Sequence, residues 1–323
     1  MKKNRRAFMK EAGLTLGAIS MGSSFIMSCG TGSPATSVVA DAVVVANTDF
    51  EISLAQWSLH KAFFAKELDP ANFPRIAKEQ FGINCIELVN QFYRDVVNDQ
   101  EYWLAFKNQC DELDVQVGLI MCDGLGHLGD ADEMARAQTV QNHHTWVDIA
   151  KYLGAHSIRV NAAGAGSSEE VSAHAIAGLT ELTAYGASKE INIIVENHGG
   201  YSSNGKWLAN VIQSVDSPYC GTLPDFGNFC IERAENGRDC LEAYDRYMGI
   251  EELMPFAKGV SAKANEFDAE GNDTQSDFLK IMTIVKKAGF KGHVGIEYEG
   301  ETLSEPEGIV ATKKLLEKTF LAL

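Results

Sequence analysis

Short apolar runs alternate with longer amphipathic segments along most of this chain, from about residue 50 to its end. This alternation is typical of parallel βαβ units, in which a buried strand is followed by a helix that covers the sheet. We predict strands at Ile52–Ser58, Cys85–Val89, Val115–Met121, Ser157–Asn161, Ile191–Glu196, Cys220–Asp225, Gly259–Lys263 and Val294–Tyr298. The chain is therefore expected to fold as an α/β protein with a parallel sheet.

The number and spacing of the units favour a closed barrel. Eight units in roughly 275 residues match the usual size of a (β/α)8 TIM barrel. One predicted outer helix carries an apolar stripe at Trp146, Ile149, Ala150 and Leu153. The alternative, a doubly wound open sheet, normally has a glycine-rich loop after its first strand, but Gln56–His60 contains no glycine.

The first 28 residues are predicted to be an export signal. Five basic residues come before or at the start of an apolar segment that ends near Met27. The run from Asn4 to Lys10 resembles a twin-arginine signal, which directs export of proteins that have already folded. An uncleaved membrane anchor is the weaker alternative, because glycines interrupt a segment that is short for a bilayer span.

The signal is followed by a predicted linker at residues 29–49 and by the barrel at residues 50–323. The run Ile26–Gly30 resembles a lipoprotein box in which Cys29 becomes lipidated. We therefore expect a periplasmic protein, exported by the twin-arginine route and attached to the membrane only by a lipid anchor at Cys29.

Charge and cysteine content limit the possible partners. Removing the first 28 residues takes away five basic residues and one acidic residue, so the formal net charge moves from −16 to −20. Such an acidic protein repels nucleic acid, whereas small neutral ligands remain possible. Six further cysteines form no C-x-x-C pair, so we expect structural thiols and no zinc-thiolate site; disulfides remain open in an oxidising compartment.

Three predicted strands end in carboxylates, at Glu196, Asp225 and Glu297. In a barrel the strand ends supply the active site. A buried carboxylate costs several kcal/mol unless it is paired or binds a cation. Each acid could instead pair with a basic residue or cap a helix, but we identify few inward-facing cations.

Those cations are Arg159, which could pair with Glu87, and Lys263. Two basic residues do not balance three converging acids and their neighbours. A divalent metal ion explains the three strand-end carboxylates better than separate ion pairs do.

The placement of these acids resembles the xylose-isomerase-like barrels of sugar isomerases and epimerases, over roughly residues 50 to 320. In that family the corresponding residues hold Mn²⁺ or Mg²⁺, which implies that Glu196, Asp225 and Glu297 are metal ligands. The family commonly has His, sometimes Gln, on the seventh strand, whereas this chain has Ser261 or Lys263 nearby. The fourth ligand stays open between water, Ser261 and His198.

A second resemblance covers residues 196–207, Glu-Asn-His-Gly-Gly-Tyr-Ser-Ser-Asn-Gly-Lys-Trp. This string is similar to a group of exported barrel proteins labelled sugar phosphate isomerase/epimerase. Asn228 stands where nuclease relatives carry a further metal-binding His, which argues against DNA repair. Because the protein is acidic and lacks a phosphate loop, we expect a neutral sugar or keto-sugar as substrate.

The family resemblance implies that Glu196 and Glu297 act on opposite sides of the substrate, one removing a proton and one returning it. Lys263 could stabilise the developing oxyanion or donate a proton, or could only pair with Glu297 or Asp225. The expected activity is therefore a metal-dependent sugar isomerase or epimerase. The alternatives are a lyase or hydratase acting on a sugar derived from a 3-keto-glycoside, and a non-catalytic sugar-binding barrel.

Polar or aromatic residues at other strand ends are candidates for substrate contacts, because hydroxyl-rich ligands need hydrogen-bonding groups and a stacking face. These are Trp57, His60, Asn90, Asp123, Asn161 and His198. Trp57 and His60 could instead only pack at the rim, and Asp123 could be a turn residue. The family resemblance also implies a possible homodimer.

Overall fold

The computed structural model describes residues 49–237 and 239–323. The predicted export signal at residues 1–28 lies outside the described residues, as does the predicted linker up to residue 48. The chain from Ala46 to Leu323 forms one compact unit, which is the subject of the following description. No helix in the described part of the chain is long and apolar enough to cross a membrane.

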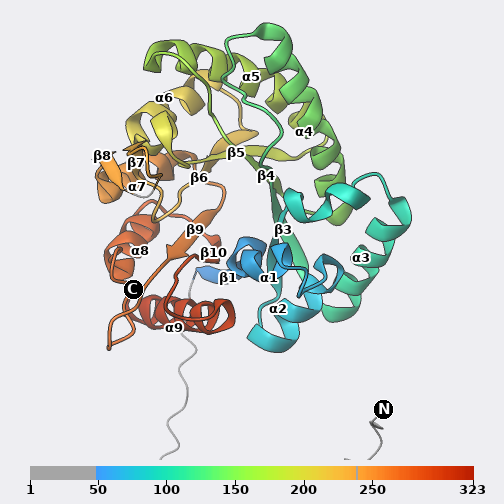
Figure 1. Cartoon of the computed structure of the whole chain (residues 1–323), viewed down its shortest axis with the longest axis vertical. Helices are drawn as coiled ribbons and strands as arrows, with labels where there is room; N and C mark the ends of the chain where they lie inside the picture. Colours follow the sequence, from blue (N-terminus) through green and yellow to red (C-terminus); the bar gives the residue numbers. More distant parts are fainter. Residues whose placement is uncertain (1–48, 238) are drawn as a thin grey trace, which may run out of the picture. The chain divides into compact units, whose positions relative to one another are not determined.

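Eight parallel strands form a continuous sheet in the order β6-β5-β4-β3-β2-β1-β10-β9. Their bounds are β1 Phe50–Ala55, β2 Cys85–Val89, β3 Gln116–Met121, β4 Ser157–Val160, β5 Asn192–Glu196, β6 Cys220–Leu223, β9 Val260–Ala264 and β10 Gly292–Tyr298. Parallel bridges at Thr222–Ala257 and Asp225–Ser261 join the β6 and β9 sides. The strands thus form a ring enclosed by helices, which confirms the predicted (β/α)8 TIM barrel (Figure 1).

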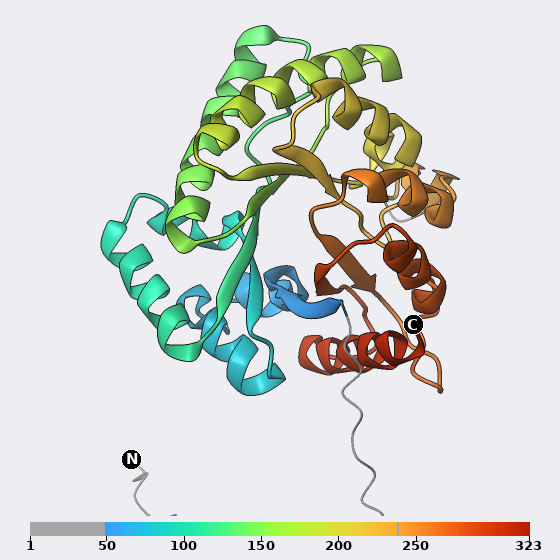
Figure 2. The ribbon, with the colours of Figure 1, turned by 180° about the vertical axis from the view of Figure 1, so that it is seen from behind.

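The helices surround this ring, and Figure 2 shows the same arrangement from behind. They are α1 His60–Phe64, α2 Phe73–Phe81, α3 Gln100–Leu113, α4 Glu133–Leu153, α5 Ser168–Ser188, α6 Gly205–Val215, α7 Arg246–Leu253, α8 Phe278–Lys287 and α9 Glu305–Ala322. The predicted stripe of α4 is buried, and this helix ends at Leu153, after which Gly154, with a φ of 81°, closes the last turn.

The first strand is shorter than predicted. β1 ends at Ala55, and Gln56–Leu59 form a 3-10 turn. The buried Gln56 side chain accepts a hydrogen bond from the backbone N–H of Val89 and donates one to the hydroxyl of Tyr93. These bonds to the next βα unit hold the chain in a turn where its apolar pattern indicated a strand.

A hairpin that was not predicted follows β6. It consists of β7 (Cys230–Arg233) and β8 (Cys240–Ala243), which pair antiparallel and are joined by a disulfide between Cys230 and Cys240. The cysteines at 85, 110, 122 and 220 are free and buried. The question left open by the sequence is therefore resolved as one disulfide and four thiols among the described cysteines.

The barrel has two apolar layers. Most buried side chains lie in a large cluster that includes residues of both strands and helices. A smaller cluster consists of Ala55, Val89, Leu119, Met121, Ile194 and Leu223, all from the strands of the ring.

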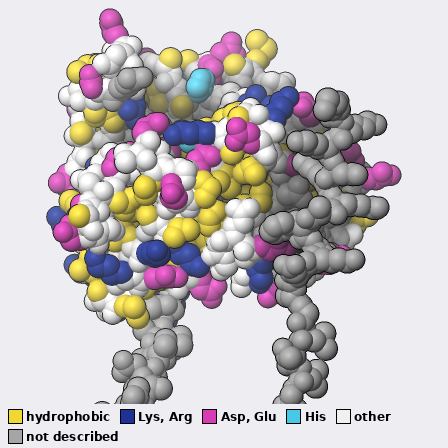
Figure 3. Space-filling view, turned by 60° about the horizontal axis from the view of Figure 1, so that its bottom comes forward, with side chains coloured by type: hydrophobic (Ala, Val, Ile, Leu, Met, Phe, Trp, Pro, Cys, Tyr) yellow, Lys and Arg dark blue, Asp and Glu magenta, His cyan; other side chains and the backbone are white. Residues whose placement is uncertain are grey.

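On the outer face in Figure 3, acidic and basic side chains are interspersed around apolar patches.

Candidate active site

Glu196, Asp225 and Glu297 converge at the carboxyl ends of their strands. Glu196 is the last residue of β5, Asp225 follows β6, and Glu297 lies in β10. Each offers a carboxylate oxygen, and these oxygens all lie within 4.8 Å of one another. The three side chains are 0%, 0% and 4% exposed, so water can solvate their negative charges only slightly.

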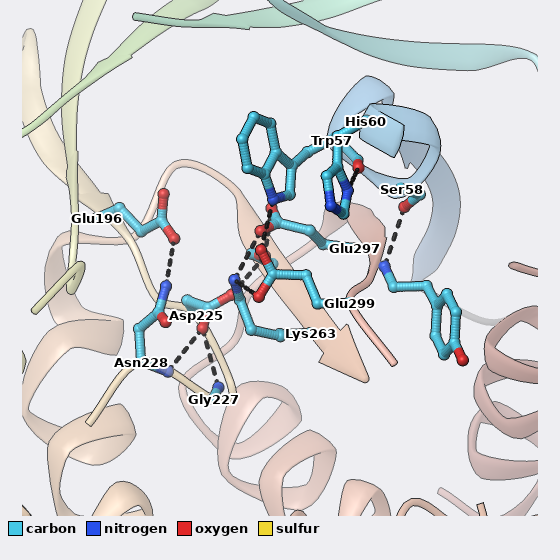
Figure 4. Close-up of polar contacts among 12 residues, drawn as sticks. Trp57, Ser58, His60, Glu196, Asp225, Gly227, Asn228, Lys263, Glu297 and Glu299 are labelled. Atoms are coloured by element: carbon cyan, nitrogen blue, oxygen red, sulfur yellow. Dashed lines mark hydrogen bonds and ion pairs between the residues drawn. The ribbon is translucent and has the colours of Figure 1, made fainter. Parts of the chain in front are cut away.

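Neighbouring polar groups fix the orientation of these carboxylates (Figure 4). Asp225 Oδ1 accepts hydrogen bonds from the backbone N–H groups of Gly227 and Asn228, at 2.9 and 2.8 Å. Asn228 Nδ2 also donates to Glu196 Oε1 at 2.9 Å. Ser261 Oγ donates to Asp225 Oδ2 at 2.7 Å and lies 3.5 Å from Glu297 Oε2, so it faces the same space as the three acids.

Lys263 contacts two acids, Glu297 of β10 and Glu299, which follows that strand. Its Nζ is 2.7 Å from Glu297 Oε1 and 3.0 Å from Glu299 Oε2. Burial disfavours the charged ammonium, but the negative charges of Glu297, Asp225 and Glu299 raise the pKa of Lys263 well above its ordinary value. Lys263 is therefore a fixed positive charge within the site.

Arg159 forms different ion pairs from the one expected. Its guanidinium is 2.7 Å from Asp123 Oδ1 and 2.9 Å from Glu196 Oε2, so the suggested pairing with Glu87 is wrong. Glu87 accepts instead from Ser53 Oγ at 2.6 Å, and its carboxylate lies against Gly295. Strand alternation correctly predicted that Arg159 points into the barrel. It could not decide whether Glu196 or Glu87 lies at the same height along the barrel axis.

Trp57 and His60 lie at the rim, near Glu299 (Figure 4). Their rings are stacked, with centroids 4.7 Å apart, and His60 Nδ1 lies 2.7 Å from the Trp57 carbonyl oxygen. The indole N–H of Trp57 donates to Glu299 Oε1. Trp57 is thus connected through Glu299 to Lys263, which places an aromatic face next to the charged site.

The other candidate contact residues form a network at the β2, β3 and β4 ends. The Asn90 amide donates to the Asp123 carbonyl and accepts from its N–H, so it joins two loops. Asn161 Nδ2 donates to Asp123 Oδ1 at 2.7 Å. Although burial opposes its charge, Arg159 and the hydrogen bond from Asn161 lower the pKa of Asp123 to about 2. His198 lies exposed just beyond Glu196.

The residues present fit a divalent cation. Burial raises the pKa of both Glu196 and Asp225 to about 7, because their negative charges are incompletely compensated. Arg159 Nε is near Glu196 Oε2 but poorly aligned, and this buried oxygen has no hydrogen-bond donor among the described residues. Opposite oxygen ligands of Mg²⁺ lie about 4 Å apart, close to the spacing of these carboxylates.

The local charge balance supports the same fit. Two cations, Arg159 and Lys263, are in ion-pair contact with four acids of the site, and Asp225 is a fifth acid beside them. A bound divalent ion would offset much of the remaining negative charge.

Sequence reasoning missed Glu299, Asn197 and the contact made by Asn228. Glu299 lies two residues after Glu297, so strand alternation alone could have placed both on one side. Asn197 directly follows Glu196; its amide donates to the Asp225 carbonyl and accepts from the Asp225 N–H, at 3.0 and 2.8 Å. No sequence signal identified Asn197 or the contact of Asn228 with Glu196, because both residues act across strands.

Solved structures of several sugar-processing proteins have the same fold. A D-tagatose 3-epimerase-like protein superposes with a TM-score of 0.63 and 17% identity, over 84% of this chain and 97% of that one. The apo form of 3-keto-D-glucoside 4-epimerase from E. coli gives 0.59 and 12%, over 84% and 99%. A barrel protein from Mycobacterium smegmatis in complex with magnesium gives 0.60 and 14%, over 84% and 97%.

These identities establish similarity of fold, and one of these relatives carries a metal ion. Among curated proteins, none matches this sequence. The family described as "Xylose isomerase-like TIM barrel" matches residues 75–319, which is most of the chain. The chain therefore belongs to the xylose isomerase-like TIM barrel family.

Proposed function

We propose that this protein is an exported, divalent-metal-dependent isomerase or epimerase that moves a proton next to the carbonyl of a neutral sugar or keto-sugar. The observation that carries the proposal is the set of three buried carboxylates, Glu196, Asp225 and Glu297, with oxygens within 4.8 Å of one another. Lys263 places a fixed positive charge beside these acids, which a site that only binds sugar would not need.

The metal would be held by Glu196, Asp225 and Glu297, with Ser261 as a further oxygen ligand. An all-oxygen set favours Mn²⁺ or Mg²⁺. The bound ion would supply Lewis-acid chemistry toward the carbonyl oxygen and its neighbouring hydroxyl. Ser261 supports this assignment because its hydroxyl lies against two of the three carboxylates.

Glu196 and Glu297 are the proposed bases, one removing the proton beside the carbonyl and the other returning it. Asn228 and Arg159 hold Glu196, and Lys263 holds Glu297, so the two carboxylates approach the site from different strands. Because Lys263 stays charged, it suits stabilisation of negative charge on the substrate oxygen and not attack as a neutral amine.

The proposed substrate contacts surround this centre. Trp57 and His60 provide a stacked aromatic face, and Asn161 and His198 provide hydrogen-bonding groups at neighbouring strand ends. Asn90 and Asp123 support the proposal indirectly, because they hold the loops and Arg159 in place. The acidic character of the chain favours a sugar without phosphate groups.

The deciding experiment is metal analysis of the chain from residue 31 onward, which keeps the whole unit from Ala46 to Leu323. We expect about one Mn or Mg per chain in the wild type, and loss of the metal in Glu196→Gln and Glu297→Gln. The exposed Glu112→Gln is the matched control. A wild type that holds no metal and cannot be loaded would overturn the mechanism and leave a sugar-binding protein.

Reaction type is tested by incubating the loaded enzyme with keto-sugars in D₂O. Incorporation of deuterium beside the carbonyl with epimer or isomer formation is the expected outcome. Loss or addition of water would instead assign the lyase or hydratase activity, which uses the same acids. The family resemblance also implies a homodimer, which light scattering in the same buffer tests.

We also propose that the protein is periplasmic, exported by the twin-arginine route and lipid-anchored at Cys29. The Cys230–Cys240 disulfide supports an oxidising compartment. In cells fed a labelled fatty acid, we expect label on the wild-type protein and none on Cys29→Ala. Equal labelling of both proteins would exclude the anchor.

A further inference from the structure

A cleft of about 390 Å³ lies beyond the carboxylates, in the range of small-molecule pockets. Its lining comes from residues 162–164 after β4, residues 199–201 after β5, the β7–β8 hairpin, and Val171 of α5. The hairpin contributes Ile231, Glu232 and Glu242. Nothing in the site described above uses this space.

Each wall of the cleft continues directly from a residue of the candidate active site. Asn161 precedes the first wall, and Asn228, which contacts Glu196, lies three residues before Ile231. Gly199 follows Glu196 by three residues, and three residues span at most about 10 Å. The cleft therefore lies at the same end of the barrel as the proposed catalytic carboxylates and within reach of a ligand larger than one sugar ring.

The walls leave room near the backbone. Positive φ angles of 88° and 61° occur at Gly199 and Gly200, and a Cβ at either position would meet nothing within 4 Å. Tyr201 also lines the cleft, and its hydroxyl donates to the Gly166 carbonyl at 3.1 Å. These features give an open shelf with an aromatic side chain at its edge.

The hairpin wall carries an unfavourable charge arrangement. Glu232 and Glu242 are directly opposed across the two strands, and like charges in this position destabilise a hairpin. Both side chains are exposed, and neither has an ion-pair partner among the described residues. The Cys230–Cys240 disulfide holds the strands together despite this repulsion.

We propose that this cleft is a binding subsite for a second sugar ring, glycosidically attached to the ring that reacts at the carboxylates. Glu232 and Glu242 accept hydrogen bonds from its hydroxyl groups, while Tyr201 and Ile231 contact its apolar face. The natural substrate is then a disaccharide or other glycoside, not a free monosaccharide. The inference rests on the proposed function, whose substrate class it narrows.

The test compares a keto-glucose with the corresponding keto-disaccharide, using deuterium incorporation as the assay. For the wild type we expect kcat/KM to be at least about 10-fold higher for the disaccharide. The Ile231→Trp substitution fills the cleft and should remove this preference. Leu241→Trp is the matched control, because Leu241 lies on the same hairpin, is exposed and does not line the cleft.

A second variant changes chemistry without adding bulk. Glu232→Gln combined with Glu242→Gln should lower the disaccharide preference at least about threefold, and Glu235→Gln at the hairpin turn should not. The double variant should also resist urea better than the wild type, because the repulsion is removed, which shows that the hairpin is folded. An unchanged preference in both cleft variants would overturn the subsite.

Binding of the unreacted sugars separates this inference from the proposed function. We expect cellobiose to bind more tightly than glucose by calorimetry, with the difference lost in Ile231→Trp. Cellobiose binding without any proton exchange would retain the subsite and refute the enzyme. Exchange at equal rates on both keto-sugars would retain the enzyme and refute the subsite. Failure of both sugars to bind would refute the subsite and leave the enzyme to be judged by the exchange assay.

Discussion

Glu196 and Glu87 are both buried glutamates inside the same barrel, but their surroundings differ. Burial raises the pKa of each to about 7. At the carboxyl ends of the strands, Glu196 meets two other acids, a guanidinium and an amide. Glu87 has one hydrogen bond, from Ser53, and a second oxygen without a partner among the described residues.

Burial of a glutamate in this barrel does not by itself indicate a functional role. Glu87 lines a cavity of about 180 Å³ at the opposite end of the barrel, where strands begin. A raised pKa is common to both residues, so it cannot by itself identify a catalytic group. What distinguishes Glu196 is convergence with Asp225 and Glu297, together with cations that hold the acids in defined positions.

The strongest test of this difference is activity. We expect Glu297→Gln to lower kcat/KM for proton exchange by about 1,000-fold, because it removes the proposed base and proposed metal ligand at once. Glu87→Gln, with the same loss of charge in the same barrel, should remain within about threefold of wild type. Equal losses in the two variants would show that burial, not convergence, matters.

Lys263 gives the next largest expected effect. Replacing it by Met should reduce kcat by about 100-fold, because the proposed oxyanion would lose its fixed positive charge and Glu297 would lose its ion-pair partner. Lys263→Arg keeps the charge and should recover part of the rate. A change confined to KM in steady-state kinetics would restrict Lys263 to substrate binding.

Glu87 should reveal itself in stability as a function of pH. Its folded pKa of about 7 exceeds the ordinary value of 4.5, so between these values the folded state keeps a proton that the unfolded state has released. Stability is therefore lost as the pH rises through this window. At pH 8, Glu87→Gln should be more stable than wild type by about 2–3 kcal/mol in urea denaturation.

At pH 4 that stability advantage of Glu87→Gln should disappear, because the wild-type side chain is then protonated in both states. A constant difference between the two proteins across this pH range would mean that Glu87 is not desolvated as the structure indicates.

The smallest effect concerns the space around Glu87. A Cβ at Gly295 would lie 2.5 Å from Glu87 Oε1, so Gly295→Ala should destabilise the protein by about 1–2 kcal/mol. Adding Glu87→Ala should recover part of this loss, because the three atoms nearest to the new methyl group all belong to the Glu87 side chain. Additive effects in the double variant would contradict the contact.

The sequence allowed the fold to be predicted in some detail. Each of the eight barrel strands overlaps its predicted segment, and Cys85–Val89 agrees at both ends, whereas β1 begins and ends earlier than predicted. The acids at or near the ends of β5, β6 and β10 could also be predicted, because a charged residue after an apolar run is easy to recognise. The hairpin was missed because its strands are short and exposed, and thus carry no apolar alternation.

What the sequence determined by itself is the order of buried and exposed segments, since hydrophobic periodicity is a local property of neighbouring residues. It thereby determined the barrel and which acids stand at strand ends. Only the tertiary structure decided that Arg159 pairs with Glu196 and not Glu87, and that Asn228 holds Glu196. Those contacts depend on the level at which different strands align around the barrel, which is set by packing of the whole ring and not by any one segment.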